Sequence, residues 1–478
     1  MKSKSLLKIM AIMILLTMLA SPLALAAEET PVSTSPMATL FAFIGVIVLL
    51  LVLISKFDWH VMLALLVPLL LFGALPSVNI EAFKAAFVKG FGGTLGEIGV
   101  VIALGCIIAE ALKETNAVQR ITLTMTKLVG KNKMPLALAF TGFILGIAVF
   151  SDVAYIILNP LVHSLAEAAG VPLAVMSTGL VGALQLTHAL VPPTPGPLAA
   201  AAVMGADIGL VILFGAVACF FGTLGAWAWG LFIGKKIDVM PSKEYTGEST
   251  GLEDTENMPG TANAFMPILI PVLLIAGTSV AKLVLPAGNM LLQILNYLGW
   301  PVVALTIGLW LAYSNVKGKE AKNASKQEWV KTGLQNSAMI LIVTGLGGSL
   351  SHVLRGTPVV DTIANGVVNT GLPPIFLPFI IGIIGNTITG STTVGVITAG
   401  SLVAPMLGTL GISAEAAMLA GGSGAVIIKY VNSSYFWVCT SLSEMEASQG
   451  IKAYGGATFV GGICSFLAVW AMTGLGIL

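Results

Sequence analysis

The side chains best suited to chemistry in this chain gather at a proline-rich interruption of an apolar run. Thr187 and His188 end a hydrophobic stretch, and a cluster of prolines follows at once, so a continuous helix cannot pass. In a bilayer, irregular backbone persists only where protein or a water-filled cavity covers it, and such breaks mark transporter substrate sites. The alternative is a surface loop between two spans. We predict a substrate site that contains Thr187, His188, Pro193, Thr194 and Gly196.

A second polar interruption, Ser151 and Asp152, lies within a long apolar run from Met134 to Leu165. Placing a carboxylate there costs at least ~2.5 kcal/mol, which favours its protonated form. We therefore expect Asp152 to carry a coupling proton together with His188, because histidine ordinarily titrates near neutral pH. Ser151 is assigned to the substrate site. The structural alternatives are an aspartate that caps a broken half-helix and a histidine whose hydrogen bonds are satisfied within the core.

A glycine-flanked segment rich in hydroxyl groups interrupts an apolar run in the second half of the chain. Backbone amides freed at the N-terminus of a half-helix, together with hydroxyl groups, make a cradle for a carboxylate. Serine and threonine also pack between membrane helices, which is the alternative explanation. The predicted substrate residues of this segment are Asn386, Thr389, Gly390, Ser391, Thr392 and Thr393.

A lysine within the apolar run 418–438 forms the fourth group. Lys429 is the cation of that run, and we expect it to pair with an anionic substrate. Snorkelling of the ammonium to a water interface is the alternative. Asn432, Ser433 and Ser434 follow and are assigned to substrate hydroxyls or to freed backbone.

The sequence indicates neither an enzyme nor a cofactor. It contains no H-E-x-x-H zinc motif, no G-x-x-x-x-G-K-[ST] phosphate loop and no paired cysteine spacing. An intramembrane aspartyl protease that uses Asp152 and Asp207 is a distant alternative, and a passive channel is another. The net charge of +1 argues against a nucleic-acid partner. The expected partners are a small carboxylate and membrane lipid, and the coupling ion is H⁺, with Na⁺ as the other option.

The composition is that of a membrane protein. Hydrophobic residues make up 56% and charged residues 9%, whereas soluble proteins carry roughly 25% charged residues. Apolar runs of about 20 residues recur, which predicts an all-α polytopic protein of about 12 transmembrane helices in the cytoplasmic (inner) membrane. One span is expected from about Leu95 to Leu112, after the pair Gly92–Gly93. Residues 1–26 resemble a signal peptide, and an uncleaved first span is the alternative.

The polar interruptions recur at one offset along the chain. Adding 242 maps Ser151 onto Thr393 and His188 onto Tyr430, so the second pair of breaks falls where the first does. The basic loop 113–133 maps onto 355–375, which contains a single arginine, so equivalent loops are expected on opposite faces. This predicts two inverted-topology repeats with broken or re-entrant helices. The expected organisation is a first half, 37–234, with repeat 1 at about 91–210; a polar cytoplasmic linker, 235–262; and a second half, 263–478, with repeat 2 at about 333–454.

Four stretches of the chain resemble the gluconate permease family of proton symporters. They are Gly90–Gly96 (GFGGTLG), Gly146–Val153 (GIAVFSDV), Thr187–Leu198 (THALVPPTPGPL) and Val431–Trp437 (VNSSYFW). The resemblance implies secondary active import of gluconate or a related sugar acid by proton symport. It also implies a homodimer in which a transport domain, built from the repeated blocks, moves against a scaffold.

The chain departs from that family's pattern at four positions. Thr194 stands where the family usually has a second histidine, Ser433 where it has an aspartate, and Asn386 where it has an arginine; Lys429 has no usual counterpart. We therefore expect Lys429 to supply the missing cation. These departures keep open a sodium-coupled carrier of another organic acid or of D-serine.

Overall fold

The structure is a computed structural model, and its described part is helical throughout, without a strand. It describes residues 59–75, 78–129, 133–242, 258–286, 288–316, 319–355, 371–430 and 433–478, with isolated positions at 45, 46, 48, 49, 52, 53, 57, 365 and 369. The predicted signal segment 1–26, most of the linker 235–262 and Asn432 lie outside these residues.

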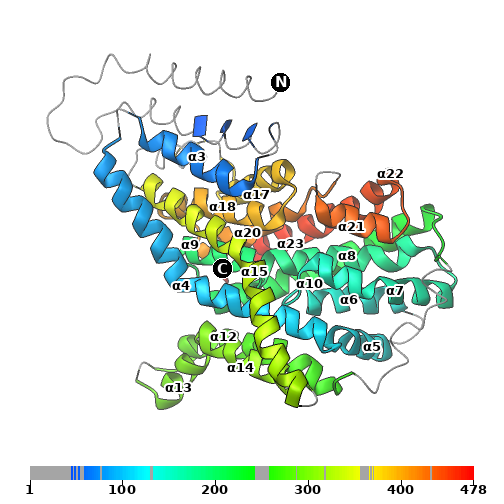
Figure 1. The fold of residues 1–478 in the computed structure, drawn as a ribbon. Helices are drawn as coiled ribbons and strands as arrows, with labels where there is room; N and C mark the ends of the chain where they lie inside the picture. The colour runs from blue at the N-terminus through cyan, green and yellow to red at the C-terminus, as the bar shows by residue number, and fades with distance from the viewer. Residues whose placement is uncertain are drawn as a thin grey trace.

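The helices follow one another through two similar series (Figure 1). The first is α3 (Val61–Gly73), α4 (Ile80–Glu114), α5 (Ala117–Val129), α6 (Met134–Leu145), α7 (Ser151–Ala169), α8 (Leu173–Leu190), α9 (Pro195–Met204) and α10 (Ile208–Ile233), closed by the turn η2 (Gly234–Lys236). After α12 (Thr261–Val284) and α13 (Met290–Leu298), the second is α14 (Pro301–Ser314), α15 (Lys319–Arg355), α17 (Phe376–Thr389), α18 (Thr392–Val403), η4 (Ala404–Met406), α19 (Leu407–Leu410), α20 (Ala414–Val426), α21 (Ser434–Leu442), α22 (Ala447–Gly450), the π-helical turn η5 (Ile451–Gly455) and α23 (Gly456–Gly474).

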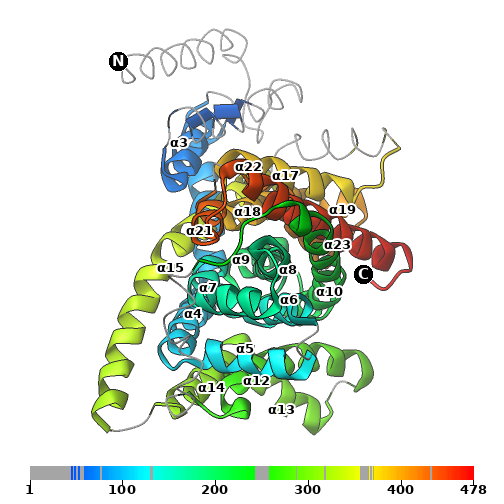
Figure 2. The same cartoon turned by 90° about the vertical axis from the view of Figure 1, so that its right-hand side faces the viewer.

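Helix α8 is the centre of the bundle. Every one of its residues is buried, and it packs against α6, α7, α10, α20 and α23. Figure 2 shows α6, α7, α10 and α23 around it. Small residues allow this density. A Cβ on Gly182 would overlap Ala226 of α10, and one on Gly142 of α6 would lie 2.7 Å from the Leu180 carbonyl oxygen. The polar residues at the C-terminal end of α8 are thus enclosed by other helices and have no contact with lipid.

Two long helices, α4 and α15, cross beside this bundle, with α12 and α14 packed next to α4 (Figures 1 and 2). Helix α4 runs without a break through Gly92–Gly93 and contains the predicted span, Leu95 to Leu112. A glycine inside a helix costs only about 1 kcal/mol, which packing outweighs. The crossing requires Gly90, because a Cβ there would overlap the Gly348 carbonyl of α15.

Long apolar helices identify a multi-pass membrane protein. Among the described residues, six helices are long and apolar enough to cross a bilayer, or seven if α13 and α14, bent by 63° at their junction, count as one span. Four other interruptions leave shorter half-helices: between α6 and α7, α8 and α9, α17 and α18, and α20 and α21. These are the four interruptions that the sequence predicted.

The two helix series have matching bounds. Adding 242 to the bounds of α4 gives 322–356, against Lys319–Arg355 for α15; adding it to α6 gives 376–387, against Phe376–Thr389 for α17. Adding 242 to α10 gives 450–475, where η5 and α23 lie. The correspondence of lengths thus reaches beyond the blocks 91–210 and 333–454.

The glycine contact between α4 and α15 makes a testable prediction. We expect Gly90→Ala to lower the stability of the protein by about 1–3 kcal/mol, because the added methyl group overpacks a backbone contact. The measurement is the melting temperature of the purified protein in detergent. Gly92→Ala is the matched control, since nothing lies within 4 Å of a Cβ there. A Gly90→Ala protein as stable as the control would contradict the close crossing.

Candidate functional site

The four helix breaks meet in one polar cluster inside the bundle. Hydrogen bonds join the ends of α7 and α8 in the first half to the N-terminus of α18 in the second, and Lys429 joins the α20–α21 break to the α17–α18 break. Breaking a helix leaves unpaired amides at one new end and unpaired carbonyls at the other. The cluster therefore contains both donors for an anion and acceptors for a cation.

Gln185 connects the two halves, and the list of predicted site residues missed it. Its amide nitrogen donates to Thr392 Oγ1 at 2.5 Å, and its amide oxygen accepts from Ser151 Oγ at 3.3 Å. All three side chains are buried. The available signal was a glutamine in an apolar run, one helical turn before His188.

His188 lies beside this link with one ring nitrogen unpartnered. Its Nε2 lies 3.5 Å from Thr393 Oγ1, and its ring centroid lies 5.8 Å from that of Phe150. Nδ1 is buried and has no hydrogen-bond partner among the described residues. A buried ring nitrogen without a partner carries a desolvation cost of about 1–3 kcal/mol. This nitrogen is thus available to a bound ligand.

The N-termini of α9 and α18 lie against each other next to His188. A Cβ on Gly196 would stand 3.2 Å from the Cα of Thr393, so only glycine allows this approach without a shift. Further along, Gly400 of α18 packs against Ala200 of α9. The positive ends of two helix dipoles that converge favour negative charge near them, although Pro195 and Pro197 leave few free amides in the first turn of α9.

Lys429 is buried in the α20–α21 break with neutral acceptors only. Its ammonium donates to Asn386 Oδ1 at 2.9 Å and to the Gly390 carbonyl oxygen at 3.0 Å, with a longer contact to Ser433 Oγ at 3.5 Å. The ion pairs of the described residues involve other lysines, and no carboxylate there pairs with Lys429. Asn386 in turn donates to the carbonyl oxygen of Ile428.

Three of the positions at which the sequence departs from the expected pattern form one structural unit, because Asn386 and Ser433 both accept from the Lys429 ammonium. The fourth position, Thr194, is separate, and its hydroxyl donates to the Val191 carbonyl oxygen at 2.6 Å within the proline break.

Asp152 occupies the first turn of α7 and is half-buried. Its Oδ1 accepts from the amide of Val153 at 3.0 Å, which satisfies part of the helix end, as the structural alternative anticipates. Asp152 also lies within electrostatic range of His188, as Lys429 does. The carboxylate is thus positioned beside the polar cluster, and its role as a proton carrier stays a prediction.

Several predicted residues have local structural contacts. Thr187 donates to the carbonyl oxygens of Ala183 and Gly142, which holds α8 against α6. Thr389 donates to the Gly385 carbonyl oxygen, and Ser391 Oγ accepts from the Val394 amide at the start of α18. Ser434 begins α21 and is exposed. These contacts make the individual hydroxyls weaker candidates than the helix ends that carry them.

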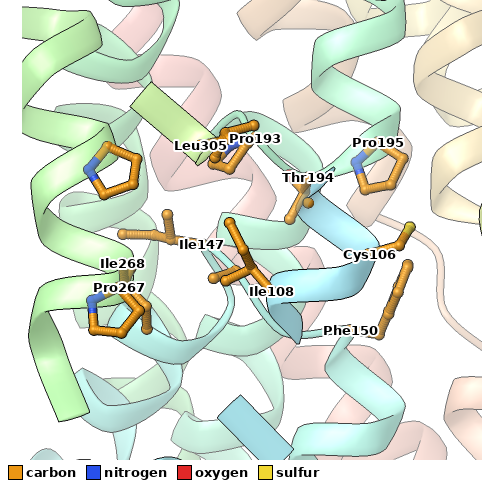
Figure 3. A pocket seen from close by; sticks show the side chains of 13 residues that line it. Cys106, Ile108, Ile147, Phe150, Pro193, Thr194, Pro195, Pro267, Ile268 and Leu305 are labelled. Carbon is orange, nitrogen blue, oxygen red and sulfur yellow. The ribbon is translucent and has the colours of Figure 1, made fainter. Parts of the chain in front are cut away.

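An apolar pocket borders the first two breaks (Figure 3). Figure 3 shows Thr194 and Phe150 on one side of the pocket and Pro267 and Ile268 on the other. The Thr194 hydroxyl is already bonded within its own loop, so this wall offers little to a carboxylate. The full lining is Gly105, Cys106, Ile108, Ile147, Ala148, Phe150, Pro193, Thr194, Pro195, Pro267, Ile268, Pro271 and Leu305. The pocket is an apolar gap between the breaks and the layer of α4, α12 and α14.

Asp207, the other candidate of the protease alternative, is a helix cap. Its Oδ1 accepts from the amides of Gly209 and Leu210 at the start of α10 and from Ser279 Oγ at 2.5 Å. Lys282 lies 3.9 Å from its other oxygen. These partners account for the carboxylate without a catalytic role.

The Gln185 link makes a second prediction. We expect Gln185→Leu to destabilise the protein by about 1–3 kcal/mol, because it leaves the buried hydroxyls of Ser151 and Thr392 without their partner. Melting temperature in detergent measures the effect, and Gln293→Leu on the exposed face of α13 is the matched control. An unchanged melting temperature for Gln185→Leu would mean that the two halves are held together elsewhere.

Comparison with known proteins identifies the family. The model of the family described as GntP family permease matches residues 37–475. The gluconate permease of Zymomonas mobilis is 30% identical over 93% of this chain and 100% of its own length. The D-serine transporter DsdX of Escherichia coli K12 is 29% identical over 89% of this chain and 96% of its own.

A solved structure supports the fold. The YdaH transporter of Alcanivorax borkumensis superposes with a TM-score of 0.58 at 16% identity, over 93% of this chain and 99% of that one. At that identity the likeness concerns the fold alone. Because the family match spans nearly the whole chain and the relatives are permeases, the protein belongs to the GntP permease family and is a membrane transporter, not an enzyme.

Proposed function

We propose that this transporter is a secondary active importer of a small hydroxylated carboxylate, gluconate or a related sugar acid, by proton symport across the cytoplasmic membrane. The observation that supports the proposal is the sorting of charge in the polar cluster: the N-terminus of α18 and the buried Lys429 supply positive potential, and no described carboxylate forms an ion pair with Lys429. A small anion completes such a site.

In this proposal the substrate carboxylate binds between the N-termini of α9 and α18. His188 Nδ1 donates to it, since that nitrogen lacks a protein partner. Gly196 lets the α9 backbone approach α18 closely, and the Thr393 hydroxyl lies on the side of His188. The substrate's hydroxyl groups take the remaining polar groups of the cluster, among them Ser151. Lys429 contributes positive potential and no direct hydrogen bond to the substrate, because its two short hydrogen bonds and its long contact are all to protein acceptors.

We further propose that the two helix series are inverted repeats of an approximately 12-span protein. The matching bounds of α3–α10 and α14–α23 support a repeat longer than 91–210 and 333–454, divided by the linker 235–262. In the homodimer that the family resemblance suggests, α4, α12, α14 and α15 belong to the scaffold and the broken helices to the transport domain. The apolar pocket then lies along the boundary between them.

Proton coupling is assigned to Asp152, with His188 beside it. Asp152 is half-buried at a helix N-terminus and within electrostatic range of the histidine, so its charge state affects the site that binds the substrate. A sodium-coupled carrier of an organic acid or of D-serine is the second candidate. It is favoured by the D-serine transporter among the relatives.

Uptake into proteoliposomes tests the proposal. The panel is gluconate, glycerate, 2-keto-3-deoxygluconate, fructuronate and D-serine, each measured with an imposed pH gradient and then with a sodium gradient. We expect one sugar acid to accumulate with the pH gradient alone. Accumulation that requires sodium would favour the second candidate, and equilibration without accumulation would identify a passive channel.

His188 makes a prediction about substrate affinity. We expect His188→Ala to raise the KM for the transported acid by about tenfold or more, because a charge-assisted hydrogen bond contributes roughly 1.5–3 kcal/mol. Thr187→Val is the neighbouring control, since the Thr187 hydroxyl faces two main-chain carbonyls and its loss is expected to leave KM nearly unchanged. The reverse pattern would assign the substrate contact to Thr187.

A further inference from the structure

The surroundings of Lys429 are those of a bound cation. The three atoms around its ammonium are an amide oxygen, a main-chain carbonyl oxygen and a hydroxyl oxygen, from Asn386, Gly390 and Ser433. Such neutral oxygen ligands are the kind that broken membrane helices present to sodium. The ammonium carries the same single charge as the ion.

The local helix ends also favour a cation at this point. Gly390 caps the C-terminus of α17, and Lys429 follows the C-terminus of α20 at Val426. Helix C-termini carry partial negative charge, so two of them face the ammonium. Asn386 fixes the arrangement, since its oxygen accepts from Lys429 while its nitrogen donates to the Ile428 carbonyl oxygen.

Lys429 forms no ion pair in the described structure. Its side chain is only 4% exposed, which excludes snorkelling to water, and it pairs with no described carboxylate. A buried ammonium without such a partner is costly, and it persists only where oxygen dipoles compensate. Here the dipoles of two helix ends and an asparagine do so.

We infer that the Lys429 ammonium occupies a monovalent-cation site as a tethered cation, and that shortening this side chain opens a sodium site formed by Asn386 Oδ1, the Gly390 carbonyl oxygen and Ser433 Oγ. The inference deepens the proposed function and rests on it. It gives a physical reason for the proton coupling proposed above, because the position that a sodium ion would take is filled by the protein. Lys429 thus determines which ion the carrier uses, while the substrate anion binds at the helix N-termini.

The test compares the full-length wild-type protein with Lys429→Ala in sodium chloride and in choline chloride. For purified protein in detergent, we expect sodium to raise the melting temperature of Lys429→Ala by about 2 °C or more and to leave the wild type unchanged. For uptake of gluconate driven by a pH gradient, we expect Lys429→Ala to be about tenfold less active in choline chloride and to recover in part with sodium.

Two further variants make the result specific. In Lys429→Ala combined with Asn386→Ala, the response to sodium should disappear, because the site loses its amide oxygen. Lys282→Ala, on α12, removes a lysine elsewhere in the protein and should behave as the wild type in both salts. If Lys429→Ala is recovered poorly, Lys429→Ser serves in its place, and recovery as a monodisperse protein only in sodium chloride would support the site.

Three results would overturn the inference: sodium stimulation of the wild type, full activity of Lys429→Ala in choline chloride, or no effect of sodium on either property of the variant. These are distinct from failure of the proposed function. If the wild type accumulates no acid of the panel, the proposed function fails, and the melting temperatures still report on the cation site.

Discussion

The requirement that every backbone group inside a membrane find a partner within the protein governs this structure. Four helices are interrupted, and each interruption frees amides on one side and carbonyls on the other. Lipid cannot form hydrogen bonds with these groups, so the breaks must lie against one another or against polar side chains. The burial of α8 along its whole length, the approach of α9 to α18 and the contacts of Lys429 all follow from this need.

The freed ends are sorted by charge. The N-termini of α7, α9 and α18 gather around Gln185 and His188, whereas the C-termini of α17 and α20 gather around Lys429. Amide ends and carbonyl ends thus face different neighbours within one cluster. This polarity allows a site built mostly from backbone to hold an anion and a cation near each other with few charged side chains, as the 9% charged composition requires.

Sequence patterns located the breaks well because the causes of the breaks are local. The prolines at 192, 193, 195 and 197 prevent one helix from continuing through this stretch. The Asp152 carboxylate would be costly to bury in the middle of an unbroken apolar helix. The contacts between the breaks were harder to predict from the sequence. The link from Gln185 to Thr392 joins residues 207 positions apart, and only the packed structure brings them together.

Two other features depended on packing that the sequence pattern does not contain. Thr187 and His188 are neighbours in the chain, but successive residues of a helix face different directions. The Thr187 hydroxyl therefore contacts α6, whereas the His188 ring lies near Thr393. The pair Gly92–Gly93 lies inside α4, which continues through it and packs against α15 along its length. A glycine looks the same in the sequence whether it ends a helix or allows two helices to pack closely, and only the surrounding structure distinguishes the two cases.

The crossing of α4 and α15 at Gly90 also has a mechanical meaning. Helix α4 meets the proline break at Gly105, where a Cβ would stand 3.3 Å from the Pro193 carbonyl oxygen. These two points are 105 − 90 = 15 residues apart, or about 22 Å at the rise of an α-helix. Gly333 of α15 packs equally closely on Ile107 of α4, so α15 holds α4 at both ends of this stretch, and the two helices form one stiff wall beside the proline break.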